Sequence, residues 1–225
     1  MKGILDKIDP LDVDDFLFKV EESFQIKIID DDFKVNTFGE FVDYVADKLN
    51  QKYLINDKSC TSQFLFYKIR NKLINSKFSK ENIKPETKLN KIISLKNRKK
   101  KILEIQSQLG FKIDALRTPH IIPLAILLVF VFLIFNLFFQ MVSTELLLIG
   151  FGMFLGLIFI SNPLTIIFKD KTLGQLIKRI ERENYLMSQK NQDKYNPKEV
   201  ETNLKEFFTD YFDFQNQTFT RDTIL

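Results

Sequence analysis

The side chains that most often perform catalysis or bind metals are scarce in this chain. Its 225 residues include a single cysteine, Cys60, and a single histidine, His120. A structural zinc ion usually takes about four such ligands, so these two cannot complete a zinc site. No catalytic triad, phosphate-binding loop or pair of buried carboxylates is evident from the sequence either. We therefore expect a protein that is not an enzyme and that holds no cofactor or metal.

A basic run, by contrast, predicts a site that binds anions. It consists of Arg98, Lys99, Lys100 and Lys101. Clusters of about four to eight basic residues next to a membrane helix usually contact anionic lipid headgroups, and this is the ligand that we expect. The alternatives are an acidic protein surface, either the acidic arm of this chain or an acidic carrier, and a face that is merely solvated. Nucleic acid is not expected as a partner, because neither an aromatic platform nor a known nucleic-acid-binding motif accompanies the run.

Two long apolar runs must determine where these side chains are placed. Residues 121–142 and 146–168 contain no charged side chain, and only a short connection with Glu145 separates them. Each run is long enough for the ~20 residues that a helix needs to cross a bilayer. Backbone polar groups must be paired within lipid, so each run is most simply one helix. The sequence therefore predicts a two-helix transmembrane hairpin over residues 119–168.

Basic residues on both sides of the hairpin predict its orientation. They are Arg98, Lys99, Lys100, Lys101, Lys112 and Arg117 before it, and Lys169, Lys171, Lys178, Arg179 and Arg182 after it. Basic loops stay on the cytoplasmic side, so we expect a protein of the inner (cell) membrane with two spans and both termini in the cytoplasm. A single cysteine is compatible with that reducing compartment.

The two parts of the chain that precede the hairpin differ in charge. Residues 1–60 contain 8 lysines and 14 acidic residues, whereas residues 61–117 contain 15 basic and 4 acidic residues. An acidic N-terminal part is therefore followed by a basic part that adjoins the membrane.

The first 55 residues predict two amphipathic helices. Asp9 precedes Pro10, a combination of an N-cap acceptor and a first-turn proline that favours a helix start. Apolar residues then recur at helical spacing, with acidic residues on the other face. The apolar residues are Leu11, Phe16, Val20 and Phe24, and the acidic residues are Asp12, Asp14, Asp15, Glu21 and Glu22. A capping box at residues 37–40 predicts the start of the second helix.

These two helices together resemble an acyl carrier protein, from the second helix of that family to its last. The residues that carry the resemblance are Asp9-Pro10-Leu11-Asp12, Val20-Glu21-Glu22-Ser23-Phe24 and Thr37-Phe38-Gly39-Glu40-Phe41-Val42-Asp43-Tyr44-Val45. In the family a serine within Asp-Ser-Leu carries phosphopantetheine, and Pro10 occupies its place here. Proline has no hydroxyl, so the resemblance implies a carrier-like domain without the prosthetic group.

The resemblance also implies a site for partner proteins. In acyl carrier proteins the acidic helix is the face that partners recognise. The residues of this chain that match it, and that we expect to bind a partner protein, are Asp12, Asp14, Asp15, Glu21 and Glu22. The expected partner belongs to acyl-carrier-dependent metabolism.

A counterpart of the family's first helix lies at the other end of the chain. Asn196 and Pro197 predict a helix start, and apolar residues follow at helical spacing up to Phe212. The stretch after this helix is similar to the opening loop of a carrier. We therefore predict a permuted carrier fold in which residues 196–225 pack on residues 1–55, with Leu225 near the start of the chain.

The middle of the chain predicts a second, degenerate carrier-like unit that the hairpin interrupts. Its first half, residues 61–117, contains helices over residues 62–73 and 98–110, and residues 170–190 form the amphipathic helix that completes it. In the helix over residues 62–73, the side chains expected to face the core are Phe64, Phe66, Ile69 and Leu73. Thr172-Leu173-Gly174-Gln175-Leu176-Ile177 repeats the pattern Thr37-Phe38-Gly39-Glu40-Phe41-Val42.

Ser94 lies within one residue of the place of the prosthetic-group serine in this second unit. An isoleucine precedes it, and Lys96 and Arg98 follow. A transferase that recognises acidic carriers should be repelled by such neighbours.

The sequence thus predicts an all-α protein, with carrier-like helical bundles on a two-helix transmembrane hairpin. We expect a non-catalytic adaptor that recruits acyl-handling or carrier-dependent proteins to the cytosolic membrane face. Two alternatives stay open at this point. One is a functional carrier that is pantetheinylated at Ser94, and the other is a structural subunit of a membrane complex.

Overall fold

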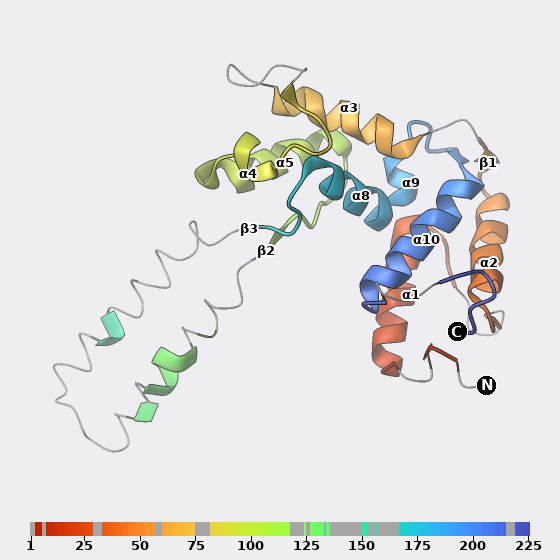
Figure 1. Ribbon diagram of the computed structural model, residues 1–225, viewed down its shortest axis with the longest axis horizontal. Helices are drawn as coiled ribbons and strands as arrows, with labels where there is room; N and C mark the ends of the chain where they lie inside the picture. Colours follow the sequence, from red (N-terminus) through yellow and green to blue (C-terminus); the bar gives the residue numbers. More distant parts are fainter. Residues whose placement is uncertain are drawn as a thin grey trace. The chain divides into compact units, whose positions relative to one another are not determined.

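The fold is known here from a computed structural model, and most of the residues that it describes are helical (Figure 1). It describes residues 3–5, 8–28, 33–56, 60–74, 82–117, 124, 127–132, 134–135, 150–152, 156, 167–214 and 219–225. The helices are α1 (Pro10–Phe24), α2 (Phe38–Asn50), α3 (Thr61–Leu73), α4 (Leu89–Ile92), η3 (Leu95–Asn97), α5 (Arg98–Leu109), α8 (Leu173–Glu183), α9 (Tyr185–Ser188) and α10 (Pro197–Tyr211). The short strands are β1 (Leu54–Ile55), β2 (Leu116–Arg117), β3 (Ile167–Phe168) and β4 (Lys194–Tyr195).

The chain divides into two compact units. Unit 1 combines Met1–Lys72 with Ile177–Leu225, and unit 2 is Leu73–Leu176. The all-α prediction is therefore confirmed at the level of fold class, because the β-structure within the described ranges consists of two-residue strands and two isolated β-bridges.

An aromatic cluster forms the centre of unit 1. The Phe16 ring of α1 packs edge-on against Phe207 and Phe208 of α10, with ring centroids 5.5 and 5.4 Å apart. It also contacts Phe41 of α2 at 6.1 Å. Helices α1, α2 and α10 therefore share one core, and Tyr185 of α9 extends it by packing on Phe24.

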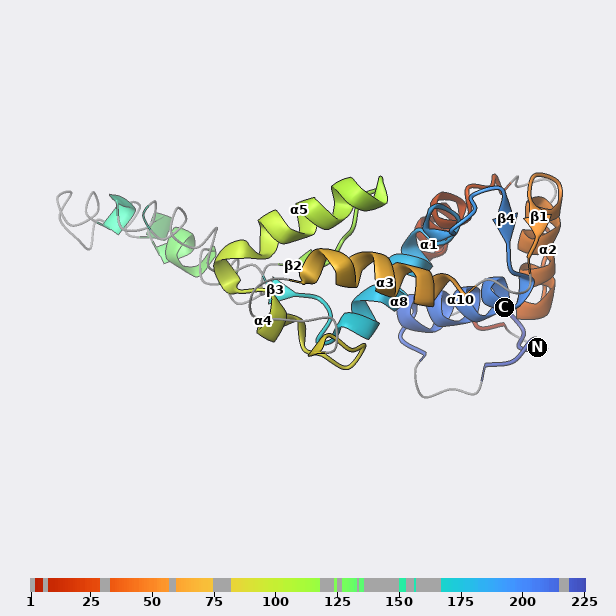
Figure 2. The same ribbon diagram turned by 90° about the horizontal axis from the view of Figure 1, so that it is seen from above.

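The end of the described chain lies beside its beginning in unit 1. The Ile4 N–H donates to the Ile224 carbonyl at 3.1 Å, and the Leu225 N–H donates to the Asn36 carbonyl at 2.9 Å. Both views of the ribbon place the N and C labels close together (Figures 1 and 2). The structure thus contains the contact between residues 196–225 and the N-terminal helices that the sequence predicts.

One arrangement of hydrogen bonds, which we name the Thr–Gly clamp, holds the start of α2. It joins residues 36–40 to residues 220–225. The Thr37 hydroxyl caps the helix by accepting from the Glu40 N–H at 3.2 Å. The Phe38 N–H donates to the carbonyl of Thr223 at 2.9 Å. The next N–H, that of Gly39, donates to the Arg221 carbonyl at 2.7 Å.

A second Thr–Gly clamp holds the start of α8 in unit 2, between residues 171–175 and 84–89. The Thr172 hydroxyl accepts from the Gln175 N–H at 3.3 Å. The Leu173 N–H donates to the Thr87 carbonyl at 3.0 Å. The Gly174 N–H donates to the carbonyl of Pro85 at 2.7 Å. The repeated sequence pattern therefore corresponds to a repeated backbone arrangement.

The transmembrane hairpin predicted over residues 119–168 lies mostly outside the described residues. Among those that are described, no helix is long and apolar enough to cross a membrane. The second predicted span is wrong at its end, because Ile167 and Phe168 form strand β3 rather than helix. Strand β3 pairs antiparallel with β2, which places Phe168 opposite Leu116. The pairing satisfies backbone groups at the point where the predicted hairpin begins and ends.

Helices α5 and α3 can be compared with the helices predicted over residues 98–110 and 62–73. Helix α5 occupies the range predicted for it, buries Ile102, Ile105 and Leu109, and ends at Gly110, which has a left-handed φ of 87°. For α3 the predicted face is partly wrong. Its buried apolar residues are Leu65, Ile69 and Leu73, whereas Phe64 and Phe66 are half-buried. Positions 65, 69 and 73 follow one stripe at four-residue spacing, and phenylalanine at 64 and 66 obscured that stripe.

The first Thr–Gly clamp predicts that one glycine-to-alanine substitution within a helix lowers stability instead of raising it. Alanine normally stabilises a helix by up to ~1 kcal/mol relative to glycine. A Cβ on Gly39, however, would lie 2.9 Å from the backbone oxygen of Arg221. Overpacking of this kind costs ~1–3 kcal/mol. We therefore expect Gly39→Ala to lower the melting temperature of the full chain in detergent by several degrees.

Gly174, the equivalent glycine of the second Thr–Gly clamp, provides the control for this melting-temperature measurement. A Cβ on Gly174 would meet the Cβ and the backbone oxygen of Pro85 at 3.2 Å, a less severe contact. Gly174→Ala should therefore lower the melting temperature less. A rise in melting temperature for Gly39→Ala would contradict the proposed tight fit of the clamp.

Candidate functional site

Helix α1 is held firmly on one side. Its N-cap, Asp9, accepts a hydrogen bond from the Leu11 N–H at 2.9 Å, and Pro10 begins the first turn. Phe16 enters the aromatic cluster. Near the other end, the Ser23 hydroxyl donates to the Arg182 carbonyl and accepts from the Tyr185 N–H. The buried face of α1 therefore fixes which side chains the helix turns outward.

The outward face of α1 combines large apolar side chains with carboxylates. Leu11 is 73% exposed and Phe18 is 55% exposed. Acidic side chains surround them, and those that are exposed are Asp12, Asp14, Asp15 and Glu22. We refer to these six residues as the acidic α1 face. Surface-exposed apolar residues bordered by charge are typical of protein-binding sites.

The prediction that Leu11 faces the core is wrong. A residue advances by ~100° around a helix, so Leu11 lies ~140° from Phe16 and almost in line with Phe18. The apolar pattern of α1 therefore contains two stripes. One is the buried stripe of Phe16, Val20 and Phe24, and the other is the exposed pair.

One predicted partner-binding residue has an internal role instead. The Glu21 carboxylate accepts a hydrogen bond from the Ile28 N–H at 2.6 Å and pairs with Lys27 at 3.3 Å. Its side chain is largely buried. Glu21 therefore holds the segment that follows α1, where Gln25 ends the helix in the left-handed region at φ 50°. It does not form part of the acidic α1 face.

The two positions considered for a prosthetic group are both exposed. Pro10 lies in the first turn of α1, at the place of the family serine. Ser94 precedes η3 and makes no side-chain cap hydrogen bond with that short helix. Lys96, Lys99 and Lys100 are exposed close to Ser94 in the sequence.

The four residues of the predicted anion-binding run have different surroundings in unit 2. Arg98 is only 8% exposed, and its guanidinium lies 5.0 Å from the centre of the Phe168 ring. Lys101 pairs with Glu104 at 2.7 Å. Lys99 and Lys100 are exposed. The prediction that Arg98 contacts an anion at the surface is therefore wrong, since cation–π packing holds it inside.

Unit 1 also contains a buried carboxylate that the sequence did not reveal. The Glu181 side chain is buried, and it accepts hydrogen bonds from the Ser62 hydroxyl and from Asn203 Nδ2. Burial raises the pKa of Glu181, and the nearby carboxylates of Glu199 and Glu206 raise the pKa further. Its neighbour Glu199 is only half-buried, so Glu181 is a single buried carboxylate that the sequence did not single out, rather than one of a buried pair.

The contacts of Glu199 give this cluster a structural role. Its carboxylate accepts from the Thr61 N–H at 2.9 Å and from the Thr61 hydroxyl at 2.7 Å. It thereby satisfies a backbone donor at the start of α3, in the manner of a helix cap. The Tyr185 hydroxyl lies 3.5 Å from the same carboxylate, and burial raises the pKa of this tyrosine. The cluster joins α3, α8, α9 and α10.

The geometry of this cluster offers little to a reaction. The Ser62 hydroxyl has Glu181 as its partner, and no imidazole lies within reach to activate it in the described part of unit 1. Within the residues that the structure describes, no group of three or more Asp, Glu, His or Cys side chains is placed to hold a metal ion. The acidic α1 face is therefore the stronger candidate for a functional site.

Comparisons with known proteins add no further assignment. No protein-family model, no curated protein and no solved structure matches this chain. The acidic α1 face and the Thr–Gly clamps are thus the features from which the function has to be inferred.

Glu181 predicts a pH dependence of stability. A carboxyl whose pKa is raised by folding stabilises the folded state while it is protonated, and this contribution is lost as the pH rises above 4.5, its ordinary pKa, and through the raised value. Glu181→Gln keeps a neutral side chain at every pH. We therefore expect the variant to exceed the unsubstituted chain in melting temperature at neutral pH, with the difference shrinking at acidic pH.

The matched control is Glu22→Gln, which removes an exposed carboxylate from α1. Thermal unfolding of both variants between acidic and neutral pH makes the comparison. A melting-temperature difference for Glu181→Gln that does not change with pH would contradict the role assigned to its buried carboxyl.

Proposed function

We propose that this protein is a membrane-anchored, non-catalytic adaptor that binds a partner protein through the acidic α1 face. The observation that carries the proposal is the exposure of Leu11 and Phe18 among carboxylates on a helix whose other face is fully packed. A rigid helix presents these side chains without having to order them on binding, which lowers the entropic cost of association.

The chemistry of this face defines the complementary surface. Binding energy in protein interfaces is concentrated in buried aromatic and apolar anchors, whereas surrounding charges steer association and select the partner. Phe18 and Leu11 would serve as the anchors, and Asp14 and Asp15 would serve as steering charges. The partner that fits is a protein with an apolar pocket bordered by lysine or arginine.

The resemblance to acyl carrier proteins supports a partner from acyl-carrier-dependent metabolism. In that family the equivalent acidic helix is the one that partners recognise. The contact of α10 with α1 and α2 supports the resemblance, because a permuted carrier fold requires residues 196–225 to pack on the N-terminal helices. Pro10 carries no hydroxyl, so the adaptor would present the recognition helix without a prosthetic group.

The apolar runs support anchoring in a membrane. The described residues of the first run expose a set of large apolar side chains, which are Leu124, Leu127, Leu128, Phe130, Val131, Phe132, Ile134 and Phe135. Such a surface is unfavourable in water and favourable in hydrocarbon. Basic residues flank both ends of the runs, so we place the parts of the chain before and after the runs in the cytoplasm.

Site-specific photo-crosslinking in cells tests the adaptor. A photoreactive phenylalanine at position 18 should capture a defined partner, and one at Tyr67, an exposed aromatic residue of α3, should not. Asp14→Lys combined with Asp15→Lys should lower the captured amount by about tenfold or more, the loss expected for central interface residues.

A charge reversal on another helix is the control for this experiment. Asp47→Lys reverses an exposed charge on α2, a different helix from the acidic α1 face, and should leave capture at position 18 unchanged. Recovery of the same proteins from positions 18 and 67, or capture that is insensitive to the reversal at Asp14 and Asp15, would contradict a partner site on α1. Captured proteins with no acyl-handling activity would contradict the assignment to that metabolism.

A further inference from the structure

We propose that the outer face of η3 and α5 lies on the surface of an anionic membrane. Leu95 and Leu103 enter the headgroup region, and Lys96, Lys99 and Lys100 bind lipid phosphates. This inference rests on the membrane anchoring proposed above and adds a second, peripheral contact to it. It also reassigns the anion-binding run, since Arg98 and Lys101 are no longer among its ligands.

The exposed face of this segment has the composition of an interfacial helix. Leu95 is 51% exposed and Leu103 is 55% exposed, although both are large apolar side chains. The lysines at 96, 99 and 100 are exposed beside them. Helices that lie in a membrane interface combine apolar side chains that enter the acyl boundary with basic residues that contact headgroups.

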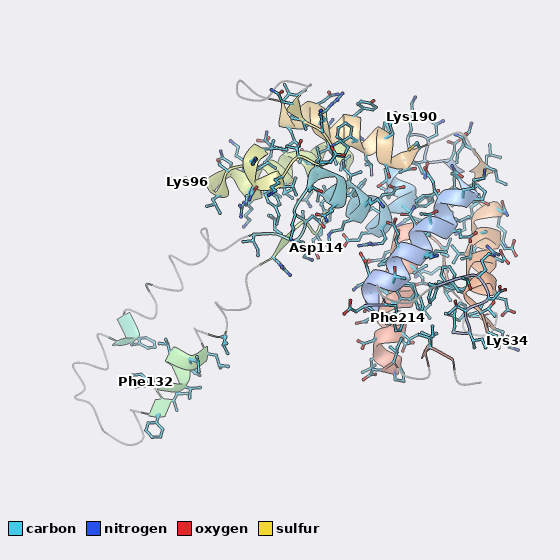
Figure 3. The ribbon with its side chains drawn as sticks, viewed as in Figure 1. Lys34, Lys96, Asp114, Phe132, Lys190 and Phe214 are labelled. Carbon is cyan, nitrogen blue, oxygen red and sulfur yellow. The ribbon has the colours of Figure 1, made fainter. Side chains whose placement is uncertain are left out.

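The opposite face of α5 is fixed inside unit 2, so the outer face has a defined direction. Ile102, Ile105 and Leu109 are buried. The helix begins immediately after η3, and Figure 3 shows Lys96 near the start of α5. The face is therefore presented by a folded element rather than by a loop.

A direct contact ties the start of α5 to the base of the apolar runs. The Arg98 guanidinium stacks on the Phe168 ring at 5.0 Å. Phe168 belongs to β3, which pairs with Leu116 and Arg117 of β2. Strand β2 lies just before the first apolar run, and β3 closes the second. If these runs enter the bilayer, Phe168 lies at its surface, and the first turn of α5 lies there with it.

The position of these lysines favours lipid over an acidic protein surface. A soluble acidic partner could pair with the same charges, but exposed Leu95 and Leu103 close to the membrane would have to be covered as well. A bilayer surface covers apolar side chains and neutralises lysines at once. Arg98 acts as the positioning residue in this arrangement, because it joins α5 to β3 and does not reach the surface.

Tryptophan fluorescence of the full chain tests the inference, because the sequence contains no tryptophan. Leu103→Trp places one reporter on the proposed face, at an exposed position where the larger ring meets no core. The variant is reconstituted in vesicles of phosphatidylcholine and phosphatidylglycerol that contain brominated lipid. We expect the brominated lipid to quench the fluorescence of this reporter, and we expect Lys99→Glu with Lys100→Glu to remove most of that quenching.

Two further reporters separate this inference from the membrane anchoring itself. Leu128→Trp reports on the first apolar run, and Phe18→Trp reports on α1. Quenching at position 128 but not at 103 overturns the inference and leaves the anchor intact, whereas no quenching at 128 overturns both. Equal quenching at positions 18 and 103, or equal quenching at 103 in vesicles of phosphatidylcholine alone, also overturns it. The inference is also overturned if position 103 is protected from quenching by iodide but is not quenched by brominated lipid. That result would indicate that an acidic protein surface covers this position.

Discussion

Packing between Phe16 and the aromatic side chains of α10 is the interaction on which the rest of unit 1 depends. Full burial of a phenylalanine contributes ~1.5–3 kcal/mol, a large share of the net stability of a small domain. Phe16, Phe208 and Phe38 are all nearly inaccessible, so this share applies to each of them. Without α10, helices α1 and α2 would expose Phe16 and Phe38 to water. The orientation of α1, and with it the direction of its acidic face, is therefore set by residues at the far end of the chain.

The two outward-facing helices resemble each other in design but carry opposite charge. Leu11 and Phe18 stand among carboxylates on α1, and Leu95 and Leu103 stand among lysines on η3 and α5. In each case the inner face is closed by packing, and one charged side chain near the outer face is turned inward for structural use. Glu21 holds the segment after α1, and Arg98 stacks on Phe168. The number of charged residues in the sequence of each segment is therefore larger than the number that its outer face presents to a ligand.

Much of the fold could be predicted from local signals. Asp9 with Pro10, the Thr37 cap and Gly110 set helix limits by short-range hydrogen bonds and backbone preferences, and the structure places helix ends there. The threonine caps of the repeated Thr-Gly pattern reflect the same local chemistry, whereas its glycines meet carbonyls distant in sequence. Features that depend on contacts distant in sequence were not predictable in the same way. The burial of Arg98 involves Phe168, and the raised pKa of Glu181 requires its burial among residues distant in sequence, with the Glu199 and Glu206 carboxylates nearby. Leu11 was misplaced because a single apolar stripe was assumed where α1 has two.

The first Thr–Gly clamp also has a consequence for the order in which the protein acquires its structure. The Arg221 side chain reaches Gly39 across 182 residues of sequence. During translation α1 and α2 must wait, with their apolar faces unsatisfied, until residues beyond 197 leave the ribosome. In the membrane-anchored protein that we propose, the apolar runs would therefore leave the ribosome before unit 1 can close, and α1 and α2 would expose their apolar faces in the interval.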